Sequence, residues 1–394
     1  MSRVEGELRW LAGILSGGED SGVAPSVAAG GPEGLVVVPG AARPRLVVPT
    51  DRRVAAAALR NHAALRSPAV HAARLGLAGA FATGAPQAVF RDRLVFPGDR
   101  GAAPLVRHLR EVLGMPGLEI AVALGPPAPN RKPVLQLLAP SGAPVGFAKV
   151  GWNAFTVPLV KNEAATLEGV TDARLQTLEA PRVMHHGPWR GSELLVTSPL
   201  PPDARRYGES APALFAASEV GTGRGMTTEA LGDSAYWRQL RTERASRAAA
   251  DLRSSFEAIE DRFGSVEMAF GDWHGDWAPW NLAHARGKLW AIDWEHARRG
   301  VPVGLDVVHF RFQVEFLRRK RPIPEAADRA AASADVDLAR LALPEEPRRV
   351  LPILHLIEIW LRAEDARRLG AGVNPRVYPA IAEEVRRRTT SLTS

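Results

Sequence analysis

The sequence predicts an α+β fold, in which a part built on an antiparallel sheet precedes a mainly helical part. Three short apolar runs of strand length follow one another between residues 118 and 150. Three helical patterns then succeed one another over residues 305–369. We therefore expect an extra N-terminal α/β segment over residues 1–115, a sheet-containing part over 116–202 and a helical part over 203–394.

The N-terminal segment carries its own mixture of patterns and is assigned no function. It contains a Gly- and Pro-rich linker over residues 17–34, which separates a first helical pattern from two apolar strands. The predicted helices are Glu7–Leu15, Arg53–Leu65 and Leu105–Leu113, and the predicted strands are Leu35–Val38 and Arg45–Val48.

The sheet-containing part begins with two apolar runs, Leu118–Leu124 and Pro133–Leu138, which are spaced as a hairpin. A third strand, Val145–Val150, holds Lys149 as its single charge among small and apolar neighbours. The segment Val157–Val170 reads as a helix, and a further strand is expected over Glu193–Leu200.

The chemistry-bearing segment runs from Gly271 to Glu295. It contains His-Gly-Asp ending at Asp276, an asparagine five residues later at Asn281, and Ile-Asp-Trp-Glu, which contains Asp293, after a short hairpin. One carboxylate at this spacing can accept the proton of an attacking hydroxyl, while an amide and a second carboxylate can bind the magnesium ions that bridge nucleotide phosphates. The pattern favours Asp276 as the base and Asn281 and Asp293 as metal ligands.

These motifs resemble those of the aminoglycoside phosphotransferase and choline kinase-like family, over residues 118–380. The resemblance implies a two-lobed protein-kinase-like fold, with an antiparallel-sheet N-lobe and a mainly helical C-lobe, and ATP and Mg²⁺ as cofactors. It implies that Lys149 binds the α- and β-phosphates and is held by Glu163 of the following helix, with Glu168 and Glu179 as rival partners. Backbone groups near Ser198 and Leu200 are expected to bind adenine.

One loop departs from the family pattern. The segment Gly125–Lys132, which should cover the phosphates, has one glycine and three prolines, and proline donates no backbone hydrogen bond. Asn130, Arg131 or Lys132 could supply phosphate contacts in its place, although plain exposed loop charge is the stronger interpretation.

Further candidates flank the motif. Trp277 and Trp280 follow the base and could stack against an acceptor molecule, although packing in the core is the default for tryptophan. Glu295 could assist a metal or orient the acceptor. Asp306, at the start of a helix, is expected to brace the catalytic loop.

The remainder of the C-lobe is expected to be helical. Residues 234–263 should form a long charged helix, favoured most strongly over 245–250, whereas the Gly-, Ser- and Ala-rich residues 207–228 indicate a loop. Three further helices are predicted over residues 305–319, 324–343 and 346–369. In the last of them, His355 and Glu358 interrupt an apolar run.

Composition excludes several classes of function. The 394 residues include no cysteine, so disulfides and thiolate catalysis are excluded. The N-terminus lacks the pattern of a secretory signal, and no apolar run reaches the length of about 20 residues that spans a bilayer. We therefore expect a cytoplasmic location and no membrane partner.

The net charge of +7 raises nucleic acid as a possible partner. The densest basic runs, at residues 318–321 and 386–388, lack interleaved aromatics and are more consistent with solvated helix ends. Residues 296–394 hold 18 basic against 13 acidic side chains, which fits a polycationic acceptor poorly.

The sequence thus predicts an ATP-dependent phosphotransferase. It is expected to act on a hydroxyl of a neutral or anionic small molecule, such as a sugar, a nucleoside-like metabolite or an amino alcohol, rather than on an aminoglycoside. Two alternatives stay open: a catalytically idle nucleotide-binding regulator of the same fold, and a nucleic-acid-associated protein whose binding would weaken steeply with salt.

Overall fold

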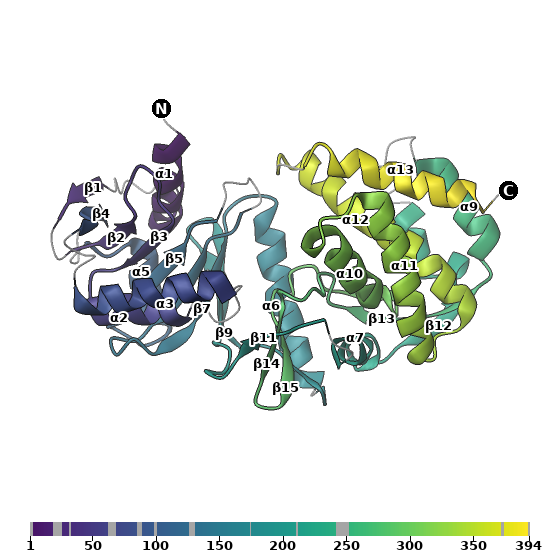
Figure 1. Ribbon diagram of the computed structural model, residues 1–394, viewed down its shortest axis with the longest axis horizontal. Helices are drawn as coiled ribbons and strands as arrows, with labels where there is room; N and C mark the ends of the chain where they lie inside the picture. The colour runs from purple at the N-terminus through teal and green to yellow at the C-terminus, as the bar shows by residue number, and fades with distance from the viewer. Residues whose placement is uncertain are drawn as a thin grey trace. The chain divides into compact units, whose positions relative to one another are not determined.

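The computed structural model describes residues 3–392 except 19–25, 31–32, 62–67, 85–88, 98–100, 126–130, 174, 210–211, 242–251 and 372–373. The chain divides into two compact units (Figure 1). The first comprises residues 1–164 and 181–206, and the second comprises residues 165–180 and 207–394. Each is described by itself.

A nine-stranded sheet organises the first unit, and every pairing within it is antiparallel. The strands predicted over residues 118–150 and 193–200 are present as its second half, and strands of the first 115 residues continue the same sheet. In spatial order the strands are β1 (Ser26–Ala29), β4 (Asp92–Val95), β2 (Leu35–Val38), β3 (Leu46–Pro49), β5 (Glu119–Ala123), β6 (Val134–Leu138), β7 (Pro144–Gly151), β10 (Ser192–Thr197) and β9 (Val183–Trp189).

Helices cover both faces of this sheet. On one face, α1 (Arg3–Ser16) and α5 (Pro104–Val112) bury leucines such as Leu11 and Leu109 against the alternate residues of β5, β6, β7 and β10. On the other, α2 (Arg52–Asn61) and α3 (Pro68–Thr83) pack against Val36, Val48 and neighbouring residues. The period-2 alternation of strand side chains produces these two separate cores. A short strand, β11 (Arg205–Arg206), ends this part of the chain.

Helix α6 (Thr156–Ala173) follows β7, as predicted. Its first turn is fixed by Asn153, whose side-chain oxygen accepts the N–H of Thr156 at 2.8 Å in the manner of an N-cap. The helix begins in the first unit and ends in the second.

The second unit is mainly helical, in agreement with the predicted α+β class. Four helices pack beside one another in Figure 1: α10 (Leu305–Gln313), α11 (Ile323–Arg340), α12 (Glu345–Arg368) and α13 (Val377–Thr390). A π-helical turn, Val314–Arg318, extends α10. The other elements are β8 (Leu178–Glu179), α7 (Pro212–Thr222), β12 (Thr227–Ala230), the 3₁₀ turn Leu231–Asp233, α8 (Ala235–Gln239), α9 (Arg253–Phe263), β13 (Glu267–Trp273), β14 (Leu282–Ala285), β15 (Lys288–Ala291) and β16 (Arg298–Pro302).

One expectation for this unit needs correction, and a second is tested only in part. The segment 207–228 is not a loop throughout, since it contains α7 and the start of β12. Small residues of α7, including Ala213, Ala216 and Ala217, are buried, so the composition that suggested a loop instead allows close packing. The long helix expected over 234–263 is present as α8 and α9, and residues 242–251, including the strongly helix-favouring 245–250, lie outside the described residues.

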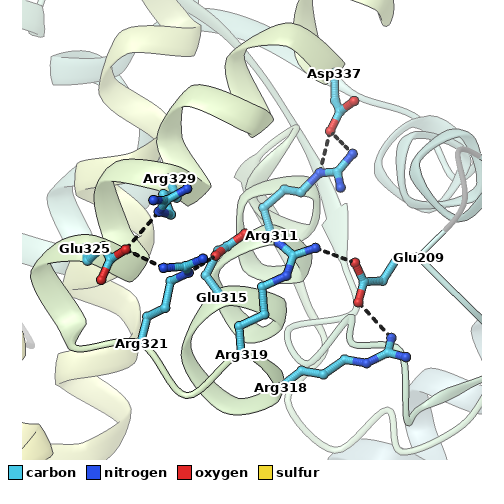
Figure 2. Close-up of polar contacts among 9 residues, drawn as sticks. All are labelled: Glu209, Arg311, Glu315, Arg318, Arg319, Arg321, Glu325, Arg329 and Asp337. Atoms are coloured by element: carbon cyan, nitrogen blue, oxygen red, sulfur yellow. Dashed lines mark hydrogen bonds and ion pairs between the residues drawn. The ribbon is translucent and has the colours of Figure 1, made fainter.

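The basic run at residues 318–321 carries paired arginines. Figure 2 shows Arg318 and Arg319 joined to Glu209, and Arg321 joined to Glu315 and Glu325. The second basic run is similar, because Arg387 and Arg388 both contact Asp328 and Glu384. Carboxylates thus neutralise arginines of both runs, which weakens the nucleic-acid interpretation.

No helix among the described residues combines the length and the apolarity needed to cross a membrane.

Candidate active site

The candidate catalytic loop begins where β13 ends at Trp273. The next residues, His274 and Gly275, turn the chain sharply, and Gly275 adopts a φ of 82°. A Cβ atom at this glycine would lie 2.3 Å from the carbonyl oxygen of His296, so the turn requires glycine for space as well as for its dihedral angle. The turn presents Asp276 directly after it.

Asp306 fixes the backbone of this turn. Its carboxylate accepts the N–H of His274 at 2.7 Å and that of Gly275 at 3.0 Å, from the first turn of α10. Burial raises the pKa of Asp306 to about 7, against the opposing effect of the two backbone donors. The brace predicted from the sequence is therefore confirmed by these two hydrogen bonds.

His274 stabilises the turn through hydrogen bonds of its buried ring. It is fully buried; its Nδ1 accepts the N–H of Asp276 at 3.2 Å, and its Nε2 lies 3.1 Å from the carbonyl oxygen of Ile292. A ring that accepts at Nδ1 and donates at Nε2 is neutral. Burial lowers the pKa of His274 to about 4, which agrees with this neutral form.

Two side chains hold the carboxylate of Asp276. Asn281 donates its amide N–H to Oδ2 at 2.8 Å and to the backbone oxygen of Asp276 at 2.9 Å. His309 of α10 lies with Nε2 3.1 Å from Oδ1. Burial acts to raise the pKa of Asp276, but the hydrogen bond with His309, the positive charge of Arg362 and other nearby groups together outweigh burial and hold that pKa well below its ordinary value. The carboxyl group is therefore ionised and available as a proton acceptor.

Asn281 and Asp293 are joined by a hairpin. Strands β14 and β15 pair antiparallel through the turn at Arg286 and Gly287, both with positive φ, as a type I′ hairpin turn requires. The N–H of Ile292 donates to the carbonyl oxygen of Asn281 at 2.9 Å, which brings the residue before Asp293 against Asn281. Asp293 itself has a φ of 70°, an uncommon conformation for aspartate that is often found at functional sites.

The chemistry of these two residues fits a magnesium ion. The amide nitrogen of Asn281 is committed to Asp276, so its amide oxygen is the atom left to bind a cation. Asp293 supplies carboxylate oxygens. Carboxylate and amide oxygens are the hard ligands that Mg²⁺ prefers.

Arg362 of α12 supports the loop from a further side. Its guanidinium donates to the carbonyl oxygen of Gly275 at 2.9 Å and lies over the ring of Trp273. Burial lowers the pKa of Arg362, but arginine remains cationic at any physiological pH. A buried positive charge beside the loop stabilises the ionised form of Asp276.

In the first unit, Lys149 pairs with Glu163 as predicted. The ammonium of Lys149 on β7 lies 2.7 Å and 2.6 Å from the two carboxylate oxygens of Glu163 on α6. The side chain of Glu163 is 3% exposed and that of Lys149 is 16% exposed. Glu168, the rival acid on the same helix, is exposed.

The residues expected to bind adenine lie just after β10. The N–H of Ser198 donates to the carbonyl oxygen of Arg182 at 2.8 Å, and its hydroxyl accepts the N–H of Arg182 at 3.0 Å. An adenine contact at Ser198 would therefore have to use its carbonyl oxygen. Leu200 is half-buried.

The candidate acceptor residues differ in exposure. Trp277 is fully buried and donates its indole N–H to the carbonyl oxygen of Ala213 at 3.0 Å. It is a core residue, and the suggested acceptor contact is corrected on this point, because a wholly buried ring offers no surface for stacking. Trp280 and Glu295 are half-buried and keep some exposed surface.

Of the candidate phosphate contacts, Asn130 lies outside the described residues, whereas Arg131 stacks on Trp10 with its guanidinium 3.8 Å from the ring centroid.

Sequence reasoning missed His309 and Arg362. His309 lies three residues after Asp306, so it shares the helix face that braces the loop. Arg362 follows His355 and Glu358 on one face of α12, where polar residues interrupt an apolar run. A polar residue at a buried helical position needs a partner, and that rule could have directed attention to both helices.

Comparison with known proteins finds resemblance in structure alone, since no protein-family model and no curated protein matches the sequence. One similar solved structure is a thermostable mutant of aminoglycoside phosphotransferase APH(4)-Ia with ADP and hygromycin B, at 13% identity and a TM-score of 0.47, covering 73% of this chain and 99% of that chain. A second, described as a fructosamine-3-kinase from Haemophilus somnus, has 11% identity and a TM-score of 0.46, with 73% and 97% covered. A glucosamine kinase has 14% identity and a TM-score of 0.35, with 70% and 91% covered.

Proposed function

We propose that this protein is an ATP-dependent phosphotransferase that moves the γ-phosphoryl group of ATP to a hydroxyl of a small molecule. The observation that carries the proposal is the arrangement around Asp276. An ionised carboxylate is held by Asn281 on one oxygen and by His309 on the other. The same Asn281 is tied through its backbone to the residue beside Asp293.

In this reaction Asp276 orients the acceptor hydroxyl and takes its proton as the oxygen attacks phosphorus. The low pKa of Asp276 keeps it unprotonated before the reaction. A weak base of this kind suits phosphoryl transfer, because the loose transition state demands little nucleophile activation before bond formation. Positioning and charge stabilisation supply most of the rate.

Asn281 and Asp293 are the residues that would hold magnesium. A metal held there would supply positive charge to offset the negative charge that develops on the phosphoryl group during transfer. The positive φ of Asp293 and the backbone link to Asn281 fix the two ligands to one hairpin. Because both ligands are already held in place, the free-energy cost of ordering them around a metal ion is smaller.

Lys149 binds the nucleotide phosphates, and Glu163 holds its ammonium in place. A lysine acts on phosphate as a point charge with three donors, and both oxygens of Glu163 occupy donors in the structure. Backbone groups near Leu200 are proposed to bind adenine.

The preferred acceptor is neutral or anionic. Residues 296–394 carry an excess of basic side chains, and one of these, Arg362, lies beside Asp276, where it donates to the carbonyl oxygen of Gly275. Fixed positive charges disfavour a polycationic aminoglycoside. A sugar, a nucleoside-like metabolite or an amino alcohol is the proposed class.

The proposal is tested by incubating the protein with magnesium-ATP and a panel of hydroxyl compounds: glucose, glucosamine, adenosine and hygromycin B. Phosphorylated products are detected by mass spectrometry, alongside Asp276→Asn and the control Asp261→Asn, an exposed carboxylate of α9. We expect a product with the wild type and the control but not with Asp276→Asn. Magnesium-ATP binding without any product would favour the catalytically idle regulator, and product formation by Asp276→Asn would remove the base assignment.

A further inference from the structure

Two histidines form a hydrogen-bonded series behind Asp276. His309 Nε2 lies 3.1 Å from Asp276 Oδ1, and His309 Nδ1 lies 3.1 Å from His355 Nε2. His309 comes from α10 and His355 from α12, and their rings meet edge to face. Their exposed fractions are 2% and 1%. The reaction described above assigns no chemical step to either ring, yet His309 touches the proposed base.

Which nitrogen of each histidine carries the hydrogen follows from the ionised carboxylate of Asp276 at the end of the series. Burial lowers the pKa of both rings below the ordinary value, so each is neutral and has one N–H. Ionised Asp276 can only accept, which assigns the N–H of His309 to Nε2. Its Nδ1 must then accept, which assigns the N–H of His355 to Nε2. The hydrogen bonds therefore run from His355 to His309 to Asp276.

Gln313 is the other polar group at this ring. Its side-chain amide nitrogen lies 3.2 Å from His309 Nε2, and its amide oxygen is buried without a hydrogen-bond partner among the described residues. Because the two ends of an amide have nearly the same shape, exchanging them would turn the oxygen toward the ring, where it would accept a share of the N–H on Nε2. The contact therefore fits the Nε2–H form of His309 once the amide is exchanged, and the form itself is assigned by Asp276.

We propose that His309 and His355 are positioning residues for Asp276, an inference that rests on the proposed phosphotransfer. His309 fixes one carboxylate oxygen while Asn281 fixes the other, so the plane of the carboxylate is set before the acceptor arrives. His355 acts only through His309, by securing the ring form that donates toward Asp276. A carboxylate that orients a catalytic histidine is a familiar device, and here a histidine orients a carboxylate.

The inference predicts a graded set of variants with a conservative rescue. His309→Phe keeps a ring but removes the donor, and we expect kcat to fall about 10²-fold with unchanged magnesium-ATP affinity, because a misplaced catalytic group costs about that much. His309→Gln places an amide N–H near the position of Nε2 and should retain kcat within about fivefold of the wild type. The exposed His284→Gln serves as the matched control. Melting temperatures exclude variants that fail to fold.

The dependence of His355 on His309 is tested by a double-mutant cycle. His355→Phe should lower kcat about tenfold in the wild type and have no further effect in His309→Phe, because its action passes through His309. An equal loss in both backgrounds would contradict the series. Equal impairment of His309→Gln and His309→Phe, both folded, would contradict the donor role.

A spectroscopic readout separates this inference from the proposed function. Nitrogen-15 NMR of histidine-labelled protein, with His309 assigned from the signal lost in His309→Gln, should show protonation at Nε2 and none at Nδ1. His355→Phe should add the Nδ1–H form. A wild-type His309 protonated at Nδ1 would overturn the inference whatever the activity. If NMR shows the predicted ring forms but no acceptor of the panel is phosphorylated, both the positioning role and the proposed reaction would be overturned.

Discussion

The candidate catalytic loop of the second unit and the Lys149–Glu163 pair of the first are supported in different ways. The loop is held from two helices, because Asp306 and His309 reach it from α10 and Arg362 reaches it from α12. Lys149 is held through Glu163, which contributes both of its carboxylate oxygens to that one ammonium.

This difference matches the two chemical tasks proposed. A base must present one lone pair along one direction, so its orientation is constrained from several sides. A phosphate-binding ammonium acts as a point charge and tolerates small displacements. We therefore expect variants at the loop to lower kcat, and variants at the lysine pair to act through nucleotide affinity.

The largest effect is expected for Asp276→Asn. The amide keeps the size of the carboxylate but cannot take a proton, so kcat should fall by about 10³-fold, within the range typical of a lost general base. Magnesium-ATP affinity, measured by calorimetry, should change little. If affinity fell with kcat in proportion, Asp276 would belong to nucleotide binding, and the contrast between the two regions would fail.

The second prediction concerns the stability of the loop brace. In Asp306→Asn one carboxylate oxygen becomes an amide NH₂, which faces a backbone N–H and leaves it unsatisfied. We expect the free energy of unfolding to fall by about 2 kcal/mol, the usual cost of such a buried group. Urea unfolding measures this change, with Asp365→Asn as the comparison. A loss confined to activity would show that Asp306 is not a structural brace.

Glu163→Gln should have a smaller effect, and on a different constant. The neutral amide removes the ion pair and can accept only one of the two hydrogen bonds from Lys149, so KM for magnesium-ATP should rise by about tenfold while kcat stays near the wild-type value. The exposed Glu168→Gln, on the same helix, should leave both constants unchanged. If Glu163→Gln lowered kcat as much as Asp276→Asn does, the loop and the lysine pair would not have the separate roles in catalysis and nucleotide affinity that we propose.

The smallest effect is a dependence of stability on pH. Burial lowers the pKa of His274 to about 4 and lowers those of His309 and His355, so the unfolded chain binds more protons than the native one below about pH 6.5. The free energy of unfolding should therefore fall as pH drops from 6.5 toward 4. Asp306, with its raised pKa of about 7, binds protons in the native state and opposes the trend.

The opposite effect of Asp306 on the pH dependence of stability allows this prediction to be checked. Asp306→Asn removes the opposing group, so its stability should decline more steeply between pH 6.5 and 4 than that of the wild type. Urea unfolding at several pH values measures both slopes. A slope that is unchanged in the variant would show that Asp306 titrates normally in the folded protein.

Local signals predicted much of the fold. The strands follow from apolar runs of strand length, which are features of neighbouring residues. The Lys149–Glu163 pair was expected from the family resemblance, which gave a role to the single charge on a strand. Helix α7 was missed because small residues are typical of loops and of tightly packed helices alike. The continuation of the sheet into the first 115 residues depends on long-range pairing, which no local pattern encodes.

The site was predictable only along the motif. Asp276, Asn281 and Asp293 lie close in sequence, so their spacing carries information. His309 reaches Asp276 from α10, and His355 reaches His309 from α12. A buried histidine in an apolar run gives no indication of its partner. Trp277 was ambiguous for a related reason, since its burial depends on contacts with Ala213 of α7.

The most direct test of the phosphotransfer account is an untargeted one. The protein is incubated with magnesium-ATP and a small-molecule extract of the cells from which it comes, and mass spectrometry compares the products with those of Asp276→Asn. The account predicts at least one compound that gains a phosphoryl group with the wild type and not with the variant. Demonstrated binding of magnesium-ATP with no such compound would contradict it.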